Sequence, residues 1–93
     1  MGQVYVIHYR HSVAKDLKKI NLKSRKVIVK KILELAHHPY PDGVSKLQGS
    51  SGLFRVRQGA YRIIYQVKNQ ELIILIVKVG HRREVYRSTL TLK

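Results

Sequence analysis

The stretch that decides the fold is LFRVRQGAYRIIYQV, residues 53–67. Apolar and polar side chains alternate on both sides of Gly59, and the apolar ones are mostly β-branched or aromatic, which is typical of strands. A glycine between two such runs favours a tight turn. The sequence therefore predicts a hairpin of two strands, residues 53–58 and 60–68.

The predicted hairpin gathers its arginines on one face. Successive side chains of a strand point to opposite faces of its sheet, so Arg55 and Arg57 share a face. Arg62, directly after the turn, is expected on that face with Gln66. The other face is then apolar and is expected to contact helices through Phe54, Val56, Ile63, Tyr65 and Val67.

The residues before the hairpin predict one strand and two helices. Residues 3–9 alternate loosely and are rich in β-branched and aromatic residues, so a first strand is expected there. Ser12 offers an N-cap for a short helix, because apolar residues follow it at helical spacing. A longer helix is expected to begin at Asn21 or Ser24. It must end near HHPYPDG, residues 37–43, where two prolines and Asp-Gly favour turns.

The remaining segments complete a single α+β domain spanning residues 1–93. A short strand is expected at residues 45–49. Residues 71–79, ELIILIVKV, are apolar on both faces, which favours an interior strand of the sheet. Residues 80–93 are irregular, and no helix is expected in them. The predicted architecture is two N-terminal helices packed on one face of a small, mostly antiparallel sheet.

The charge of the chain indicates a polyanionic partner. Nineteen Lys and Arg against five Asp and Glu give a net charge of +14 over 93 residues. Such an excess favours a nucleic acid, or an acidic protein that covers the same surface. The absence of cysteine excludes disulfides and thiolate nucleophiles, and no apolar run is long enough to span a bilayer. We expect a cytoplasmic protein with no membrane partner.

The residue types favour phosphate chemistry without a metal or another cofactor. Guanidinium groups donate paired hydrogen bonds that match phosphate oxygens. The five acids are scattered, one per element, so no carboxylate cluster for a metal is expected. RNA supplies its own nucleophile, the 2′-hydroxyl, and requires a proton acceptor and a proton donor. Arginine stays protonated, so candidates are His81, Tyr86 and Glu84, with His81 expected among the arginines.

Two segments carry a resemblance to a known family: KLQGSSGLFRVRQGAYRIIYQV, residues 46–67, and VGHRREVY, residues 79–86. In this order, and separated by one apolar strand, they resemble the RelE/ParE superfamily of toxins from type II toxin–antitoxin systems. The RelE branch is the better match. The resemblance implies the RelE-like microbial ribonuclease fold and an enzyme that cleaves mRNA in the ribosomal A site without a metal.

The resemblance also implies roles for individual residues. The basic positions that stabilise the reacting phosphate fall on Arg55, Arg57, Arg62 and Arg82, and the tyrosine that stacks on or orients the codon falls on Tyr86. The best-known member has lysines where Arg55 and Arg57 stand, one of them proposed as the general base, so His81 is the candidate for that role here. Further RNA contacts are expected from Lys46, Arg83 and Arg87.

The implied partners are a cognate acidic antitoxin, the ribosome with its mRNA and rRNA, and promoter DNA only through the antitoxin. Two alternatives stay open. A member of the ParE branch would have the same fold and poison DNA gyrase without cleaving RNA. A non-catalytic basic module would bind RNA and break no bond.

Overall fold

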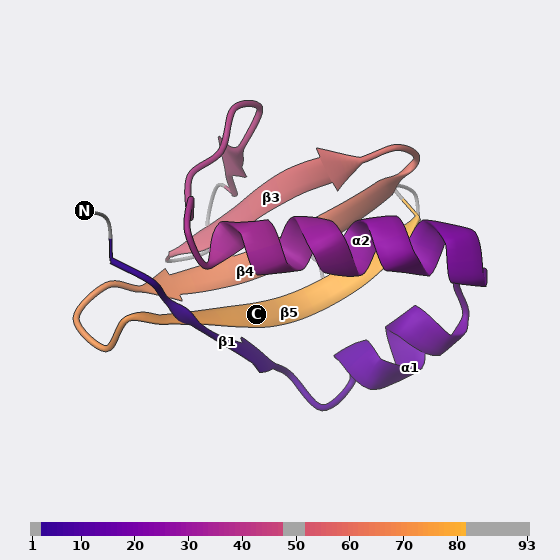
Figure 1. Ribbon diagram of the computed structural model, residues 1–93, viewed down its shortest axis with the longest axis horizontal. Coiled ribbons are helices and arrows are strands. Elements are labelled where there is room, and N and C mark those ends of the chain that lie inside the picture. Colours follow the sequence, from indigo (N-terminus) through magenta and orange to yellow (C-terminus); the bar gives the residue numbers. More distant parts are fainter. Residues whose placement is uncertain (1–2, 48–51, 82–93) are drawn as a thin grey trace.

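The computed structural model describes residues 3–47 and 52–81. They form a five-stranded sheet with helices against it (Figure 1). In chain order the elements are β1 (Val6–Tyr9), α1 (Val13–Lys18), α2 (Leu22–Leu35), β2 (Ser45–Lys46), β3 (Leu53–Gln58), β4 (Tyr61–Lys68) and β5 (Ile73–His81). No helix in these ranges has the length and apolarity that spanning a bilayer requires.

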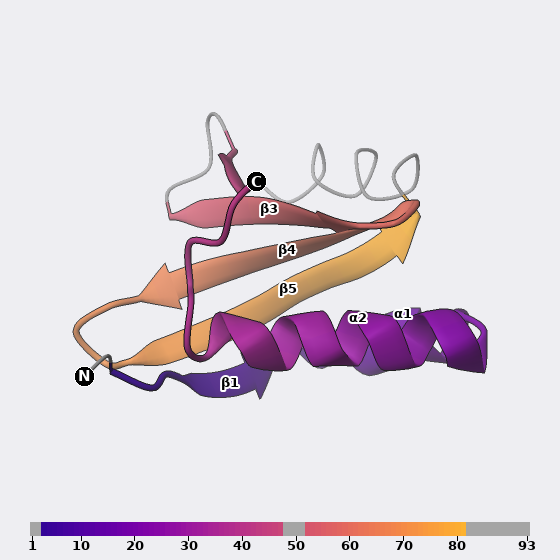
Figure 2. The same cartoon turned by 45° about the horizontal axis from the view of Figure 1, so that its top comes forward.

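The sheet has the strand order β1-β5-β4-β3-β2. Only the β1–β5 pair is parallel, and the three other pairs are antiparallel. Both helices contribute side chains to one core on a single face of the sheet. Figure 2 shows the ribbons of α1 and α2 on the same side of the strands. The predicted α+β architecture is therefore confirmed, and β5 is an interior strand as its two apolar faces indicate.

The hairpin follows the sequence closely. β3 has the predicted bounds, and β4 begins one residue later than expected because Ala60 belongs to the turn. Gly59 has a φ of +62° at the first position of this two-residue turn, a conformation that glycine adopts without steric cost. Gln58 pairs with Tyr61 directly across it. The turn therefore fixes the register of the whole hairpin.

The helices begin and end close to the predicted positions. Of the two expected starts of α2, Asn21 is the N-cap, and its side-chain oxygen accepts a hydrogen bond from the Ser24 backbone N–H at 2.8 Å. Ser12 occupies the N-cap position of α1 but makes no capping hydrogen bond through its side chain. α2 ends at Leu35, directly before the HHPYPDG stretch.

The core lies between the helices and the sheet. Tyr65 is fully buried there, and its hydroxyl donates a hydrogen bond to the Pro39 backbone oxygen at 2.6 Å. All five hairpin residues predicted to face the helices belong to this core or pack against it. The other buried members are Val13, Ile20, Ile28, Ile32, Leu35, Ile74, Ile76 and Val79.

Further strand boundaries differ from the predictions. β5 continues to His81, so Gly80 and His81 belong to a strand rather than to the irregular segment expected from residue 80. β1 begins at Val6 rather than at residue 3. β5 begins at Ile73 rather than at residue 71, because residues 69–72 form a turn in which Leu72 has a φ of +55°. β2 covers only Ser45–Lys46 of the expected 45–49, of which residues 48 and 49 lie outside the described ranges.

One irregularity interrupts the pairing of β4 with β5. Ile64 pairs with Lys78, and the next residue, Tyr65, pairs with Ile76. Val77 is therefore an extra residue on β5, which makes this a β-bulge. The bulge changes which side chains of the last part of β5 face the helices.

Candidate nucleic-acid interface

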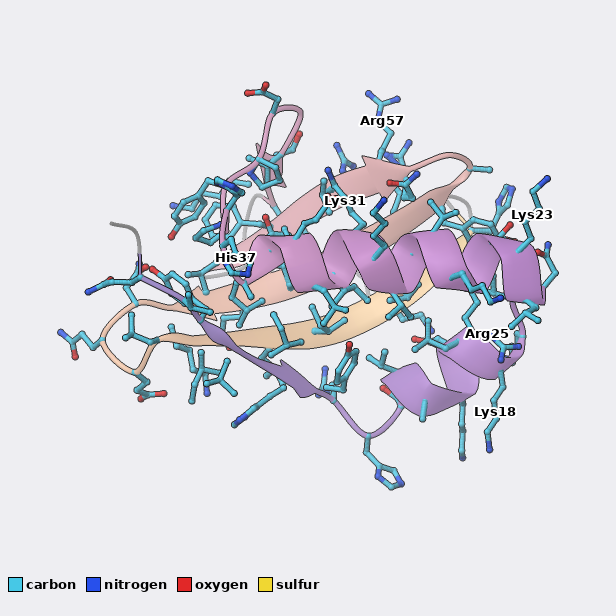
Figure 3. All side chains as sticks on the ribbon, viewed as in Figure 1. Lys18, Lys23, Arg25, Lys31, His37 and Arg57 are labelled. Carbon is cyan, nitrogen blue, oxygen red and sulfur yellow. The ribbon has the colours of Figure 1, made fainter. Side chains whose placement is uncertain are left out.

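Two arginines of the hairpin lie directly opposite each other. Arg57 on β3 pairs with Arg62 on β4, and Arg55 pairs with Ile64. Directly opposed residues of an antiparallel pair project to the same face. This arginine face, defined by Arg55, Arg57 and Arg62, is opposite to the face that packs on α1 and α2. Figure 3 shows the Arg57 side chain extending from β3 away from α2.

The three arginines differ in burial. Arg57 is exposed and Arg55 is half-buried, whereas Arg62 is only 8% exposed. Arg62 was expected on an open surface, so its burial is a finding that the alternation pattern did not predict. Its strand neighbour Ile64 belongs to a second, smaller apolar cluster on this face, with Val77 and the half-buried Leu47, Leu53 and Leu75. The arginines thus adjoin apolar side chains rather than a uniformly polar surface.

The opposed charges of Arg57 and Arg62 repel each other, and both guanidinium groups can bind an anion. Like charges placed directly opposite each other across two strands destabilise the pair. The same two guanidinium groups, on neighbouring strands with a fixed register, can donate hydrogen bonds to one phosphate from two sides. Among the described residues, no three histidine or carboxylate side chains gather in a way that could hold a metal ion.

His81 lies on the other face of the sheet, which corrects the expectation that it stands among the arginines. It pairs with Tyr61, a residue that packs against the helix-side core, and the two ring centroids are 6.1 Å apart at 79°. Arg62, by contrast, pairs with Gly80. The reason is the bulge at Val77, because an extra residue in β5 reverses the alternation of the side chains that follow.

Lys46 is also separated from the arginine face. It lies on the edge strand β2 opposite Phe54, whose ring packs at 5.1 Å from Tyr40 and at 6.0 Å from Tyr65 on the helix side. Ser45, not Lys46, is the partner of Arg55. The remaining candidates lie outside the described residues: Arg82, Arg83, Glu84, Tyr86 and Arg87.

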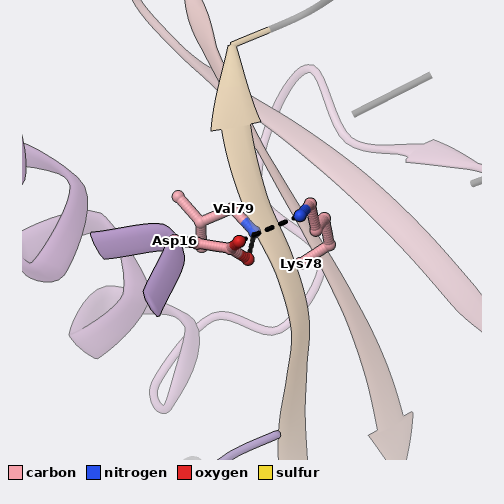
Figure 4. Close-up of polar contacts among 3 residues, drawn as sticks. All are labelled: Asp16, Lys78 and Val79. Carbon is pink, nitrogen blue, oxygen red and sulfur yellow. Dashed lines mark hydrogen bonds and ion pairs between the residues drawn. The ribbon is translucent and has the colours of Figure 1, made fainter. Parts of the chain in front are cut away.

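Asp16 on α1 is a buried carboxylate that the sequence analysis did not single out. One of its oxygens accepts a hydrogen bond from the Val79 backbone N–H at 3.2 Å, and the other lies 2.9 Å from the Lys78 ammonium (Figure 4). The ladder between β1 and β5 ends at Tyr9 and Ile76. Asp16 therefore accepts the hydrogen bond of a backbone N–H on β5 beyond the end of β1. We call Asp16, Lys78 and Val79 the Asp16 clamp.

A signal for Asp16 was present in the sequence. It lies on the same helix stripe as Val13, Leu17 and Ile20, the apolar residues that predict the buried side of α1. A carboxylate in such a stripe is expected to be buried, and a buried carboxylate is expected to have partners. The partners themselves, 62 and 63 residues away, follow only from the fold.

Comparisons with known proteins agree with this geometry. Residues 7–86 match the family described as "ParE toxin of type II toxin-antitoxin system, parDE". The chain is 34% identical to the putative toxin RelE1 of Methanocaldococcus jannaschii, over 88% of this chain and 92% of that protein. It is 27% identical to the mRNA interferase toxin RelE of Escherichia coli K12, over 88% of this chain and 90% of that protein.

A solved structure extends the likeness to three dimensions. The archaeal RelE–RelB complex from Pyrococcus horikoshii OT3 contains a chain that superposes with a TM-score of 0.76 at 28% identity, covering 86% of this chain and 97% of that one. The family match, the RelE relatives and the shared fold lead to one assignment. The chain belongs to the ParE toxin family of type II toxin–antitoxin systems, in the RelE branch of the RelE/ParE superfamily.

Proposed function

We propose that this toxin is an endoribonuclease that cleaves mRNA in the ribosomal A site, without a metal, by attack of an RNA 2′-hydroxyl. The observation that carries the proposal is the Arg57–Arg62 pair, which opposes two guanidinium groups on the face away from both helices. A phosphate that acquires negative charge during cleavage is stabilised by guanidinium groups placed on one face in this way. The relatives named mRNA interferases support the same reaction.

In the proposed reaction the arginines supply electrostatic stabilisation only. The 2′-hydroxyl gives its proton to a general base, and its oxygen bonds to the neighbouring phosphorus. The bond from phosphorus to the 5′-oxygen breaks, and the leaving oxygen takes a proton from a general acid. Arg55, Arg57 and Arg62 hold the non-bridging oxygens, and Arg82 adds to them. None of these side chains exchanges the protons, because guanidinium stays protonated at working pH.

We assign a proton transfer to His81. Tyr86, which lies outside the described residues, is proposed to orient the codon and is a further candidate for a proton transfer. His81 lies behind the arginine face, so it reaches the reacting nucleotide only if the RNA bends over the end of β4 and β5. His81→Gln separates the possibilities: an acid or base role predicts slower cleavage with a changed pH profile, and an unchanged rate and profile removes His81 from the chemistry.

We further propose that a cognate antitoxin with an acidic segment neutralises the toxin by covering the basic surface. The relatives crystallised as RelE–RelB complexes support such a partner. In this proposal the antitoxin also makes every contact with promoter DNA, and the toxin contacts only the antitoxin, mRNA and rRNA. The net charge of +14 favours an acidic segment over a neutral one.

The test is primer extension on a defined mRNA in programmed ribosomes, with and without the purified protein. We expect a new stop within the A-site codon, abolished in Arg62→Ala and unchanged in Lys68→Ala, which removes an exposed charge at the far end of β4. A toxin that inhibits growth but produces no stop would instead favour the ParE-type target, DNA gyrase. That alternative is kept because the matching family description names ParE.

A further inference from the structure

The helix side of the sheet has two pockets that share one wall, the ring of Tyr61. The turn pocket, of about 300 Å³, is lined by Lys23, Ser24, Val27 and Ile28 of α2 and by residues 58–61. The strand-end pocket, of about 150 Å³, is lined by Asp16, Lys19, Ile20 and Tyr61 and by residues 78–81. The turn pocket has no part in the proposed cleavage, and the strand-end pocket contributes to it only through His81.

The two pockets differ in character. The turn pocket is bounded mainly by apolar groups, since Val27, Ile28, Ala60 and the Tyr61 ring surround it, and its volume is at the lower end of those that hold small molecules. The strand-end pocket is bounded mainly by polar groups, with the cations Lys19 and Lys78 and the imidazole of His81 around it. An apolar pocket next to a cationic one matches the two parts of a nucleotide, its base and its phosphate.

The charges around the pockets are positive. Lys23 lines the turn pocket, and Figure 3 shows its side chain at the N-terminal end of α2. Among the residues that the structure describes, Asp16 is the only acid that lines either pocket, and its carboxylate is engaged by Lys78 at 2.9 Å and by the Val79 N–H. Lys19 and Lys23 are both exposed, so they are accessible to an anion.

The ring that separates the pockets is held in place. Tyr61 is half-buried against the core, and His81 packs edge-on against it with centroids 6.1 Å apart. A ring that stays fixed without ligand loses little entropy when a base stacks on it, which favours tyrosine as a binding platform. Gly59 also lines the turn pocket, and a Cβ placed on it would meet no atom within 4 Å.

We propose that these pockets form a nucleotide subsite for single-stranded RNA, in which an unpaired base stacks on Tyr61 and the adjoining phosphate lies between Lys19 and His81. The inference rests on the proposed function for its substrate class. RNA is favoured over an acidic peptide because the pockets pair a fixed aromatic ring, Tyr61, with the exposed ammonium groups of Lys19 and Lys23. In this geometry the RNA crosses the end of the sheet, with one nucleotide on each face.

The test uses the full toxin and a six-nucleotide RNA that carries the fluorescent base 2-aminopurine at one position, at low salt. Stacking on a tyrosine quenches this base, so the parent protein is expected to quench it in at least one labelled position. Tyr61→Leu is expected to abolish the quenching and to weaken RNA binding by about five- to a hundred-fold. Tyr61→Phe retains a ring and is expected to quench like the parent, as is Tyr9→Leu, which removes an exposed tyrosine from β1.

A second variant tests the phosphate contact at an exposed residue outside the core. Lys19→Gln is expected to reduce the magnitude of the slope of log affinity against log salt by about 0.7, the value for one phosphate contact to a single strand. Quenching that survives in Tyr61→Leu, or a parent that binds no RNA at low salt, would overturn the subsite. If Tyr61→Leu weakened the binding of an acidic peptide but not the binding of RNA, the pockets would bind a protein partner, and the RNA subsite would be overturned. Cleavage in programmed ribosomes is measured separately. If the parent protein produces no A-site stop, the proposed function is refuted, and the quenching result still stands.

Discussion

The Asp16 clamp makes a prediction about folding that can be worked out from its distances. Asp16→Ala removes the acceptor of the Val79 N–H and the partner of Lys78, and both are close contacts, at 3.2 Å and 2.9 Å. Asp16 is 8% exposed and Val79 is 1% exposed, so little water replaces what is lost. A hydrogen bond to a charged group contributes about 1.5–3 kcal/mol, and a buried donor left without a partner costs about 1–3 kcal/mol.

These two contributions overlap, because the value for the hydrogen bond already includes part of the cost of leaving the Val79 N–H without a partner. In addition, alanine has a helix propensity about 0.5 kcal/mol more favourable than that of aspartate. We therefore expect Asp16→Ala to lower the free energy of unfolding by about 2–4 kcal/mol. For a chain of this size each kcal/mol corresponds to about 4–8 °C in the melting temperature. Asp16→Asn keeps an oxygen that can accept from Val79 and loses only the ion pair, so about 1 kcal/mol is expected.

Urea denaturation followed by circular dichroism measures these differences, and hydrogen exchange of the Val79 amide locates them. The matched control is Glu34→Ala, since Glu34 is an exposed acid whose ion pair with Lys31 spans 4.0 Å and which is expected to change stability by less than about 0.5 kcal/mol. Equal losses for Asp16→Ala and Glu34→Ala would refute the reasoning. So would a Val79 amide that exchanges no faster in Asp16→Ala than a ladder amide of β4.

Three further substitutions test other parts of the structure. Arg57→Gln is expected to raise the free energy of unfolding by about 0.2–1 kcal/mol, because it relieves the repulsion from Arg62, and to lower the rate of cleavage at least tenfold. A loss of stability in urea denaturation would contradict the argument that the two arginines repel each other across the strands. Burial raises the pKa of the Tyr65 hydroxyl above its ordinary value, so the folded state keeps this proton where the unfolded state loses it. Stability is therefore expected to fall as the pH rises above about 10, the ordinary tyrosine value, and Tyr65→Phe should show a smaller fall in urea midpoints measured from pH 8 to 11. Gly59→Ala places a Cβ at a φ of +62° with open space around it, so only backbone strain counts, and thermal melting should show a loss of about 1 kcal/mol.

The parts of the fold that the sequence predicts well are those that depend on neighbouring residues. The hairpin follows from alternation around Gly59, the start of α2 from the side chain of Asn21, and the end of α2 from the prolines that follow it. The interior position of β5 follows from its two apolar faces. In each of these cases the residues that decide the structure are only a few positions apart in the chain, so the local sequence pattern is enough to predict it.

The parts that the sequence does not predict depend on contacts between distant segments. Arg62 is only 8% exposed, and a second apolar cluster forms on its face of the sheet, from residues of β3, β4 and β5 and from Leu47. Asp16 is buried because α1 packs where β1 no longer covers the edge of β5. Neither arrangement has a local pattern, although the position of Asp16 in an apolar stripe is a hint that it has partners.

The face occupied by His81 is the clearest case, because a single residue decides it. In a regular strand that continues from Ile74 and Ile76 on the helix side, residue 81 would face the arginines. The extra residue Val77 reverses this alternation, so Val79 and His81 face the helices instead. The two residues directly after the bulge, Lys78 and Val79, are the ones that Asp16 binds.

A regular register would move the Val79 N–H away from Asp16 and leave the carboxylate buried without its partners, so the clamp favours the bulged register. We infer that the acid on α1 favours the face on which His81 lies, and with it the pocket beside Tyr61. In Asp16→Ala this preference is removed, so the edge-on contact of His81 with Tyr61 is expected to weaken. Ring-to-ring nuclear Overhauser effects between His81 and Tyr61 measure that contact. If they kept full intensity in the folded Asp16→Ala variant, the bulge would be stabilised by the β4–β5 pairing alone, and the clamp would contribute stability but not register.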